Sequence, residues 1–330
     1  MHTRTAILFL LSIALATEVQ AGTMAWSLVG NIGNSPDQSY IGNGPFGAVT
    51  YAYNIGTYDV TANQYVEFLN AKDPGGLNQL GLYNNNMSNA AAGGVSFNNL
   101  NPAGSMYGVI SGRGNHPANY TSWYDSIRFA NWMNNGQGNG DTETGAYTLG
   151  TLGPGSIPVT PPLTHNAGSQ IWLPTQNEWY KAAFYDPGSS SYFLYPTSSN
   201  IVPTASGPTA APNSANYNEQ NLHLGIGITD VGAYKGTTSP YGAFDMGGNV
   251  FQWNEAMETA THRGIRGGSL LYDQSFMGAP LLTGDTPEVE INDFGFRLAS
   301  APGVPEPSTL ALAAFGFMAL VALGWRRRKR

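Results

Sequence analysis

The sequence predicts an α+β fold rather than an alternating α/β fold. Three segments combine a helix-capping residue with apolar side chains at helical spacing, and the apolar stretches that fit strands are short. Long segments rich in Gly, Asn, Ser and Pro separate these elements, at residues 74–115, 136–169 and 187–212. Few helices, short strands and long loops are typical of α+β proteins, because an α/β sheet needs a covering helix after almost every strand.

The first expected elements are a strand and a helix. The strand covers residues 48–55, and its alternating side chains are Val49, Tyr51, Tyr53 and Ile55. The helix begins after Thr61, a capping residue, and places Tyr65, Phe68 and Leu69 at helical spacing. Alternation followed by helical spacing indicates that both elements bury one face against a common core.

Two more helices and two late strands follow. Ser122 with Asp125 marks the start of a helix that runs toward Met133. Thr175 with Glu178 forms a capping box for the next helix, and the side chains expected to face inward are Trp179, Ala182 and Ala183. The late strands are expected at residues 263–269 and 294–299.

The N-terminus has the pattern of a secretory signal peptide. Residues 1–21 include Arg4, an apolar run at residues 6–16, and small side chains at Val19 and Ala21, three and one residues before a cut at Gly22. The run is too short to span a bilayer. A buried N-terminal helix is the alternative, but no polar helical face accompanies the run.

The C-terminus carries three features in order. Val-Pro-Glu-Pro-Ser begins at Val304, an apolar run covers residues 309–325, and the cationic cluster 326–330 ends the sequence. As a helix the run covers about 26 Å, close to the ~30 Å core of a bilayer. A plain membrane anchor is one interpretation. The three-part order resembles the PEP-CTERM sorting signal of Gram-negative bacteria, which implies recognition by an exosortase and transient anchoring in the inner membrane before display at the cell surface or in the extracellular matrix.

Charge and cysteine content restrict the function of the part between these ends. Of 14 Lys and Arg residues, six lie in the terminal segments 1–21 and 304–330, and of 21 Asp and Glu residues, two do. Residues 22–303 therefore hold 8 cationic against 19 acidic residues, a net charge of −11. An acidic surface repels nucleic acid. With no cysteine in the sequence, there is no disulfide and no thiol nucleophile, so stability depends on a packed core.

Six segments resemble, in order, the motifs of the formylglycine-generating enzyme (sulfatase-modifying factor) family. They are YNIGTYDVTANQYVEFLN (53–70), HPANYTSWYDSIRFANWMN (116–134), IWLPTQNEWYKAA (171–183), YGAFDMGGNVFQWNEA (241–256), RGIRGGS (263–269) and DFGFRLA (293–299). The resemblance implies the family's elaborated C-type-lectin-like α+β fold with long irregular loops. It covers a domain at residues 22–303, with a core at about 45–300.

The resemblance also implies where the family's catalytic centre would lie. Its oxidases bind copper through two cysteine thiolates, three and eight residues after the serine of Gly-Gly-Ser. Counted from Ser269, these positions hold Tyr272 and Met277. A phenol and a thioether are weaker ligands for monovalent copper than thiolates. Copper and formylglycine-generating oxidase activity are therefore not expected, and no catalytic residue is assigned.

Calcium is the one metal that the resemblance implies as a structural ion. The family binds it around the Gly-Asn-Val-x-x-Trp segment, where the matching side chains are Asp245 and Gln252 and the matching carbonyls are those of Gly248 and Val250. One carboxylate in an oxygen-only set suits calcium, although the family usually has Asn and Glu at the two side-chain positions. The start of a second calcium site matches Asn216 and Tyr217.

The other motif residues are interpreted as structural. Glu178 is expected to cap its helix rather than act in chemistry. The residues expected in the core are Leu173, Trp179, Trp253 and Phe296. The glycines expected to satisfy backbone constraints rather than bind phosphate are Gly247, Gly248, Gly267 and Gly268.

Two functions follow as hypotheses. The first is an exported, surface-sorted, non-catalytic binding or structural module, associated with an extracellular polysaccharide or a surface protein. The second is an enzyme of altered chemistry in the same cleft. Aromatic side chains in the loops could stack on sugars or pack locally, and they are Tyr83, Tyr107, Tyr120, Tyr147, Tyr192 and Tyr195.

Overall fold

The computed structural model describes residues 23–39 and 44–303. The predicted signal peptide, the sorting segment 304–330 and its expected helix at 309–325 lie outside these residues. Within the two described ranges, no helix is long and apolar enough to cross a membrane.

The helices are few and short, as the sequence predicts. The α-helices are α1 (Ala62–Lys72), α2 (Trp123–Asn134), α3 (Gln176–Phe184) and α4 (Gln220–His223). The 3-10 turns are η2 (Asn85–Ser88), η3 (Pro154–Ser156) and η4 (Gln274–Met277). The three predicted helices are confirmed. Each begins with a capping box in which side chain and backbone satisfy each other's amide hydrogens, at Thr61, Ser122 and Thr175.

Two four-stranded sheets hold the centre of the domain. The first has the order β1 (Trp26–Val29), β2 (Tyr53–Gly56), β14 (Ala299–Ser300), β5 (Ile171–Trp172), all antiparallel. The second has the order β12 (Thr283–Asp285), β11 (Arg263–Arg266), β10 (Phe251–Met257), β13 (Phe294–Phe296). In the second sheet only the β10–β13 pair is parallel.

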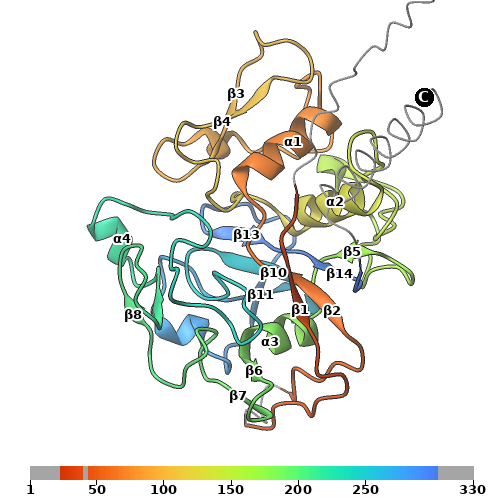
Figure 1. Ribbon diagram of the computed structural model, residues 1–330. Coiled ribbons are helices and arrows are strands. Elements are labelled where there is room, and N and C mark those ends of the chain that lie inside the picture. The colour runs from red at the N-terminus through yellow and green to blue at the C-terminus, as the bar shows by residue number, and fades with distance from the viewer. Residues whose placement is uncertain (1–22, 40–43, 304–330) are drawn as a thin grey trace, which may run out of the picture.

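Three two-stranded ribbons lie within or beside the long loops. They are β3 (Val95–Phe97) with β4 (Tyr107–Val109), β6 (Tyr185–Asp186) with β7 (Ser191–Tyr192), and β8 (Thr204–Ala205) with β9 (Ser214–Ala215). Figure 1 shows β10, β11 and β13 in the middle of the molecule, with α1 and α2 on one side and α3 on the other. The central strand β10 is therefore covered by helices from both sides.

The strand predictions need correction at their ends. The strand predicted over 48–55 begins only at Tyr53, where pairing with Val29 of β1 begins, and Tyr51 is 44% exposed instead of sharing the buried face. The strand predicted over 263–269 ends at Arg266. Gly267 and Gly268, which follow, have φ of 95° and 69°, a left-handed conformation that cannot continue a strand. The segment predicted over 294–299 is two strands, β13 and β14, which join different sheets.

The core is aromatic and extends into the loops. The predicted core residues are confirmed, because Leu173, Trp179, Trp253 and Phe296 are completely buried. Most of the loop tyrosines are also in the core, at 0–8% exposure, namely Tyr83, Tyr107, Tyr120, Tyr147 and Tyr195. The sixth, Tyr192, packs against Tyr180 and Tyr185. Of the two alternatives, local packing is therefore confirmed for the five buried tyrosines, which anchor the long loops to the domain.

Candidate functional site

The two positions that match the family's cysteines diverge in direction. Tyr272 is 39% exposed and packs against Phe251 and Phe276, with ring centroids 5.4 and 4.5 Å away. Met277 is 1% exposed and belongs to a small apolar cluster with Tyr195 and Tyr217. One side chain faces outward and the other is packed inside, so they do not form a common ligand pair.

The first predicted calcium site contains an arginine. The Oε1 atom of Gln252 accepts hydrogen bonds from Trp179 Nε1 at 2.7 Å and from Arg297 Nε at 2.6 Å, and its Nε2 donates to the carbonyl of Asp245 at 2.7 Å. Arg297 also pairs with the buried carboxylate of Asp59 at 2.8 Å. Gln252 therefore does not fit a calcium ligand in this arrangement, since its oxygen already has two donors and a guanidinium beside it.

Asp245 and Asn216 fit an ion better than Gln252 does. They line one cavity of about 10 Å³, the volume that a single water or ion fills. Asn216 Oδ1 is buried and has no hydrogen-bond partner among the described residues, while Asp245 Oδ2 accepts only a backbone hydrogen bond, from Gly232 at 2.6 Å. Burial raises the pKa of Asp245 to about 6, so a cation would stabilise its charged form. These two oxygens would hold calcium if it binds, and the ion would join the loop after β9 to the segment before β10.

The other predicted calcium ligands are held by packing and by hydrogen bonds to backbone carbonyls. Gly248 has a φ of 79°, and a Cβ there would clash with the Asn216 carbonyl. Its amide donates to the Gly267 carbonyl at 2.8 Å. Val250 is fully buried, and the Tyr217 hydroxyl donates to Pro203 at 2.6 Å. The interpretation of Gly248 and Gly267 as backbone requirements is confirmed by their left-handed conformations.

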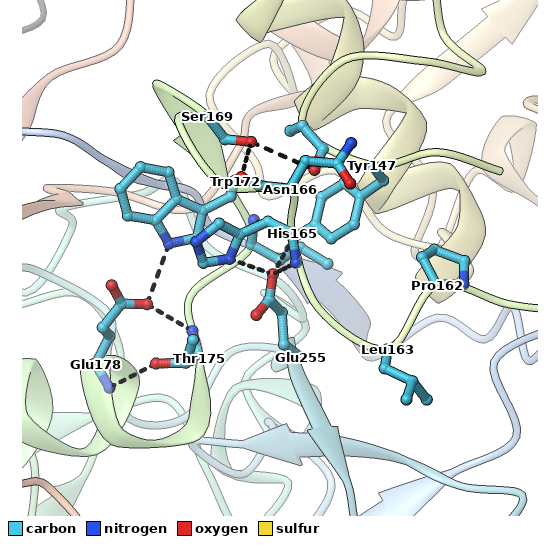
Figure 2. A network of polar contacts seen from close by, with 12 residues as sticks. Tyr147, Pro162, Leu163, His165, Asn166, Ser169, Trp172, Thr175, Glu178 and Glu255 are labelled. Atoms are coloured by element: carbon cyan, nitrogen blue, oxygen red, sulfur yellow. Dashed lines mark hydrogen bonds and ion pairs between the residues drawn. The ribbon is translucent and has the colours of Figure 1, made fainter.

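A buried polar network, absent from the sequence-based predictions as a unit, lies at the far end of β10 (Figure 2). The Oε1 atom of Glu255 accepts from the Tyr147 hydroxyl at 2.6 Å and from the backbone amide of His165 at 2.9 Å, and it lies 2.8 Å from His165 Nδ1. The other oxygen, Oε2, is buried with no partner among the described residues. Figure 2 shows the His165 ring stacked on Trp172, with ring centroids 4.7 Å apart.

Glu178 forms the second half of this network. Its Oε2 accepts from Trp172 Nε1 at 3.1 Å and from the amide of Thr175 at 2.7 Å, and its Oε1 accepts from the Tyr51 hydroxyl at 2.9 Å. The predicted capping role is confirmed, and the carboxylate also ties α3 to β5 and to the segment before β2. Burial raises the pKa of Glu178.

Electrostatics differ at the two ends of the network. Burial, with the charge of Glu255, raises the pKa of Tyr147, which stays a neutral donor. Burial alone would lower the pKa of His165, but the hydrogen bond and charge of Glu255 outweigh it, so the pKa is raised. The His165 side chain is 23% exposed, whereas that of Glu255 is 3% exposed. The pair is thus a buried carboxylate that orients an imidazole at the edge of the solvent.

No sequence pattern singled out Glu255, and Tyr147 stands out in the sequence only as an aromatic side chain in a loop. Both faces of β10 are buried at this point, so alternation along the strand does not distinguish a functional carboxylate from its apolar neighbours. Across the described part of the chain, no three His, Cys, Asp or Glu side chains are grouped to hold a metal ion.

Comparison with known families agrees with this architecture. Residues 19–302 match the family described as "Sulfatase-modifying factor enzyme 1-like domain". The chain belongs to this family. Residues 303–329 match the PEP-CTERM protein-sorting motif, which points to export and sorting in a Gram-negative bacterium and to recognition by exosortase-type machinery. No curated protein matches the sequence.

One solved structure supports the fold. Treponema denticola variable protein 1 is similar over 84% of this chain and 95% of its own, with 20% identity and a TM-score of 0.50. CarF is similar over 84% of this chain and 98% of its own, with 19% identity and a TM-score of 0.49. PvdO from Pseudomonas aeruginosa is similar over 85% of this chain and 92% of its own, with 16% identity and a TM-score of 0.43. This family member therefore has the α+β, C-type-lectin-like fold that its sequence predicts.

Proposed function

We propose that this family member is an exported, surface-sorted binding module that uses the fold without the family's oxidase chemistry. The observation that carries the proposal is the divergence of Tyr272 and Met277. One is an exposed phenol packed on phenylalanines, and the other is a buried thioether inside an apolar cluster. Thiolates at both positions would be needed to hold monovalent copper.

The partner that we propose is an extracellular polysaccharide. The PEP-CTERM motif points to export and sorting, which supports a partner outside the cell. The net charge of −11 over residues 22–303 disfavours nucleic acids and other polyanions, which leaves uncharged or weakly charged polymers. The long loops, fixed by buried tyrosines, supply preformed irregular surface of the kind that ligand-binding domains use.

A second candidate, an enzyme of altered chemistry, is favoured by one observation. The carboxylate of Glu255 lies 2.8 Å from His165 Nδ1, and the imidazole is partly exposed. A buried carboxylate that fixes the tautomer and raises the pKa of an imidazole is the arrangement of a general base. A base alone does not define a reaction, so this candidate ranks below the binding module.

The oxidase question has a direct test. The protein is exported from an exosortase-bearing Gram-negative host, purified and incubated with copper and a cysteine-containing sulfatase peptide. Mass spectrometry is expected to show no aldehyde product. Aldehyde formed by the wild-type protein would refute the non-oxidase proposal. The matched variants are Tyr272→Cys, Met277→Cys and the double variant, of which only the double can provide two thiolates.

The binding function is tested with the same protein on a glycan array and by metal analysis. Retention of an extracellular polysaccharide, with no redox metal in the purified sample, is the expected result. A stoichiometric redox metal in the purified protein, together with turnover of a tested substrate that is abolished in His165→Gln, would favour the enzyme. Binding to a surface protein in the absence of any glycan binding would contradict the polysaccharide partner.

A further inference from the structure

Two neighbouring cavities form a groove along the first turns of α2. One has a volume of about 490 Å³ and lies against the loop that contains η2. The other has a volume of about 560 Å³ and lies between the 160–163 loop, the end of β10 and Pro287. Tyr124 and Glu288 line both cavities, so the two cavities lie next to each other at these side chains. Volumes of this size are typical of small-molecule and oligomer sites.

Tyr124 is the strongest indication of a ligand. The side chain is 3% exposed, yet its hydroxyl makes no hydrogen bond to any other described residue. The hydroxyl is not among the fully buried polar atoms, so it is accessible where the side chain lines the cavities and is available to a ligand. Burial, followed by the charge of Glu288, raises the pKa of Tyr124 to about 12, so it remains a neutral donor and acceptor. A ligand hydroxyl at the junction would satisfy it.

The first cavity is polar and has spare hydrogen-bonding groups. Asn85 and Asn86 are exposed, and their side-chain amides have no hydrogen bond to another described residue. Beneath them, the carboxyl groups of Glu290 and Asp125 are hydrogen-bonded to each other. Burial and the neighbouring Asp125 raise the pKa of Glu290, so this pair holds a proton more readily than two separate carboxylates would.

The second cavity is mainly apolar. Leu163 is 66% exposed and Met257 is 43% exposed, and they line it together with Pro161 and Pro287. Its base is Arg263, whose guanidinium lies 3.8 Å above the Trp123 ring and donates to the carbonyls of Leu163 and Glu255. The arginine charge is thus used to hold the loop wall in place, and the surface left for a ligand is the apolar one.

We propose that this groove binds an uncharged oligosaccharide segment, which extends the proposed polysaccharide-binding function to a specific site. Sugars combine hydroxyl edges with apolar C–H faces, which correspond to the amides of the first cavity and the prolines and aliphatic side chains of the second. The exposed carboxylate of Glu288 at the junction repels uronates and phosphates. This chemistry selects a neutral polymer over an acidic one.

The groove is separate from the place where the family has its cysteines. Phe251, at the start of β10, contacts Tyr272, whereas Met257, at the end of the same strand, lines the groove. Six residues of extended strand place these points about 20 Å apart. Binding in the groove does not require the Tyr272 region.

The test uses the exported protein and three hexasaccharides, composed of glucose, of N-acetylglucosamine and of galacturonic acid. Isothermal titration is expected to show binding of a neutral hexasaccharide in preference to the galacturonate. Tyr124→Phe removes a single hydroxyl and is expected to weaken that binding about three- to tenfold, as is Asn85→Ala. The matched controls, Tyr65→Phe for a buried hydroxyl elsewhere and Asn139→Ala for an exposed amide, leave it unchanged.

Each remaining outcome has a defined meaning. Neutral-glycan binding that is unaffected by both Tyr124→Phe and Asn85→Ala overturns the groove but leaves the proposed function standing. Preference for the galacturonate, reproduced in Glu288→Gln, overturns the selectivity argument. Failure of the wild-type protein to bind any polysaccharide on the array or any of the hexasaccharides overturns both the groove and the polysaccharide partner.

Discussion

Replacing Tyr147 by phenylalanine isolates the contribution of the buried network to stability. The hydroxyl donates to Glu255 Oε1 at 2.6 Å and accepts from the amide of Leu173 at 2.9 Å, and the ring is completely buried. The variant keeps the ring and removes both hydrogen bonds. Glu255 then loses a donor, and the buried Leu173 amide is left without its acceptor.

The expected magnitude follows from these two losses. A hydrogen bond to a charged group contributes about 1.5–3 kcal/mol, and an orphaned buried donor costs about 1–3 kcal/mol, with part of each relieved by relaxation. We expect Tyr147→Phe to lower the free energy of unfolding by about 3 kcal/mol. In a domain of this size that is a decrease in Tm of about 6–12 °C.

Tyr65→Phe is the matched control. Tyr65 is equally buried, but its hydroxyl makes one bond, to the carbonyl of Leu82 at 2.7 Å. The expected loss is about 1 kcal/mol, because the partner is neutral. Urea denaturation and thermal melts of the exported protein measure both variants. Equal losses in the two variants would refute the reasoning that the network, rather than ring burial, stabilises the 142–169 loop.

Three further predictions use other parts of the molecule. In an exosortase-bearing host, intact-mass analysis is expected to show a protein that begins near Gly22 and lacks the segment after Pro305; retention of residues 309–330 would indicate a plain anchor. Chelator is expected to lower the Tm, because calcium at a hundredfold excess over its Kd would add about 2.7 kcal/mol to the free energy of unfolding. Asp245→Asn or Asn216→Ala is expected to remove most of that effect, since the two side chains line the ion-sized cavity. A wild-type melting curve that chelator does not move would contradict calcium binding. Because the pKa of His165 is raised above 6.5 in the folded protein, its charged form contributes stability that is complete below pH 6.5 and is lost as pH rises through the folded pKa. Stability measured from pH 5 to 9 is therefore expected to converge between wild type and His165→Gln at high pH, and a constant difference would argue against this pair.

The helices could be predicted from the sequence because their signals are local. The capping residues and their partners three positions later are at Thr61, Ser122 and Thr175, and the structure has a capping box at each. The interactions that start a helix lie within one turn, so a short stretch of sequence contains the information. Strand ends were predicted less well, since a strand ends where its partner ends and the partner is distant in sequence.

The predicted calcium ligands were likewise predictable from the sequence only in part. The motifs assign Asp245 to a first calcium site and Asn216 to a second, whereas the structure has both side chains lining one small cavity. Gln252 is predicted for the first site together with Asp245, but its oxygen accepts a hydrogen bond from Arg297, 45 residues later. The loop tyrosines gave no sign of their direction, because a tyrosine in a polar loop suits a ligand surface and an anchoring contact equally well.

The sequence by itself determined the family, the α+β class, the PEP-CTERM sorting motif and the absence of cysteine at both thiolate positions, because these depend on residue identity and short-range spacing. Only the tertiary structure decided that Tyr147 and His165 both contact one carboxylate oxygen of Glu255. It also decided that Tyr124 lines two neighbouring cavities. Such contacts join residues up to 108 positions apart in the chain. They exist only after long-range packing has brought the loops onto the sheets, which local propensity does not specify.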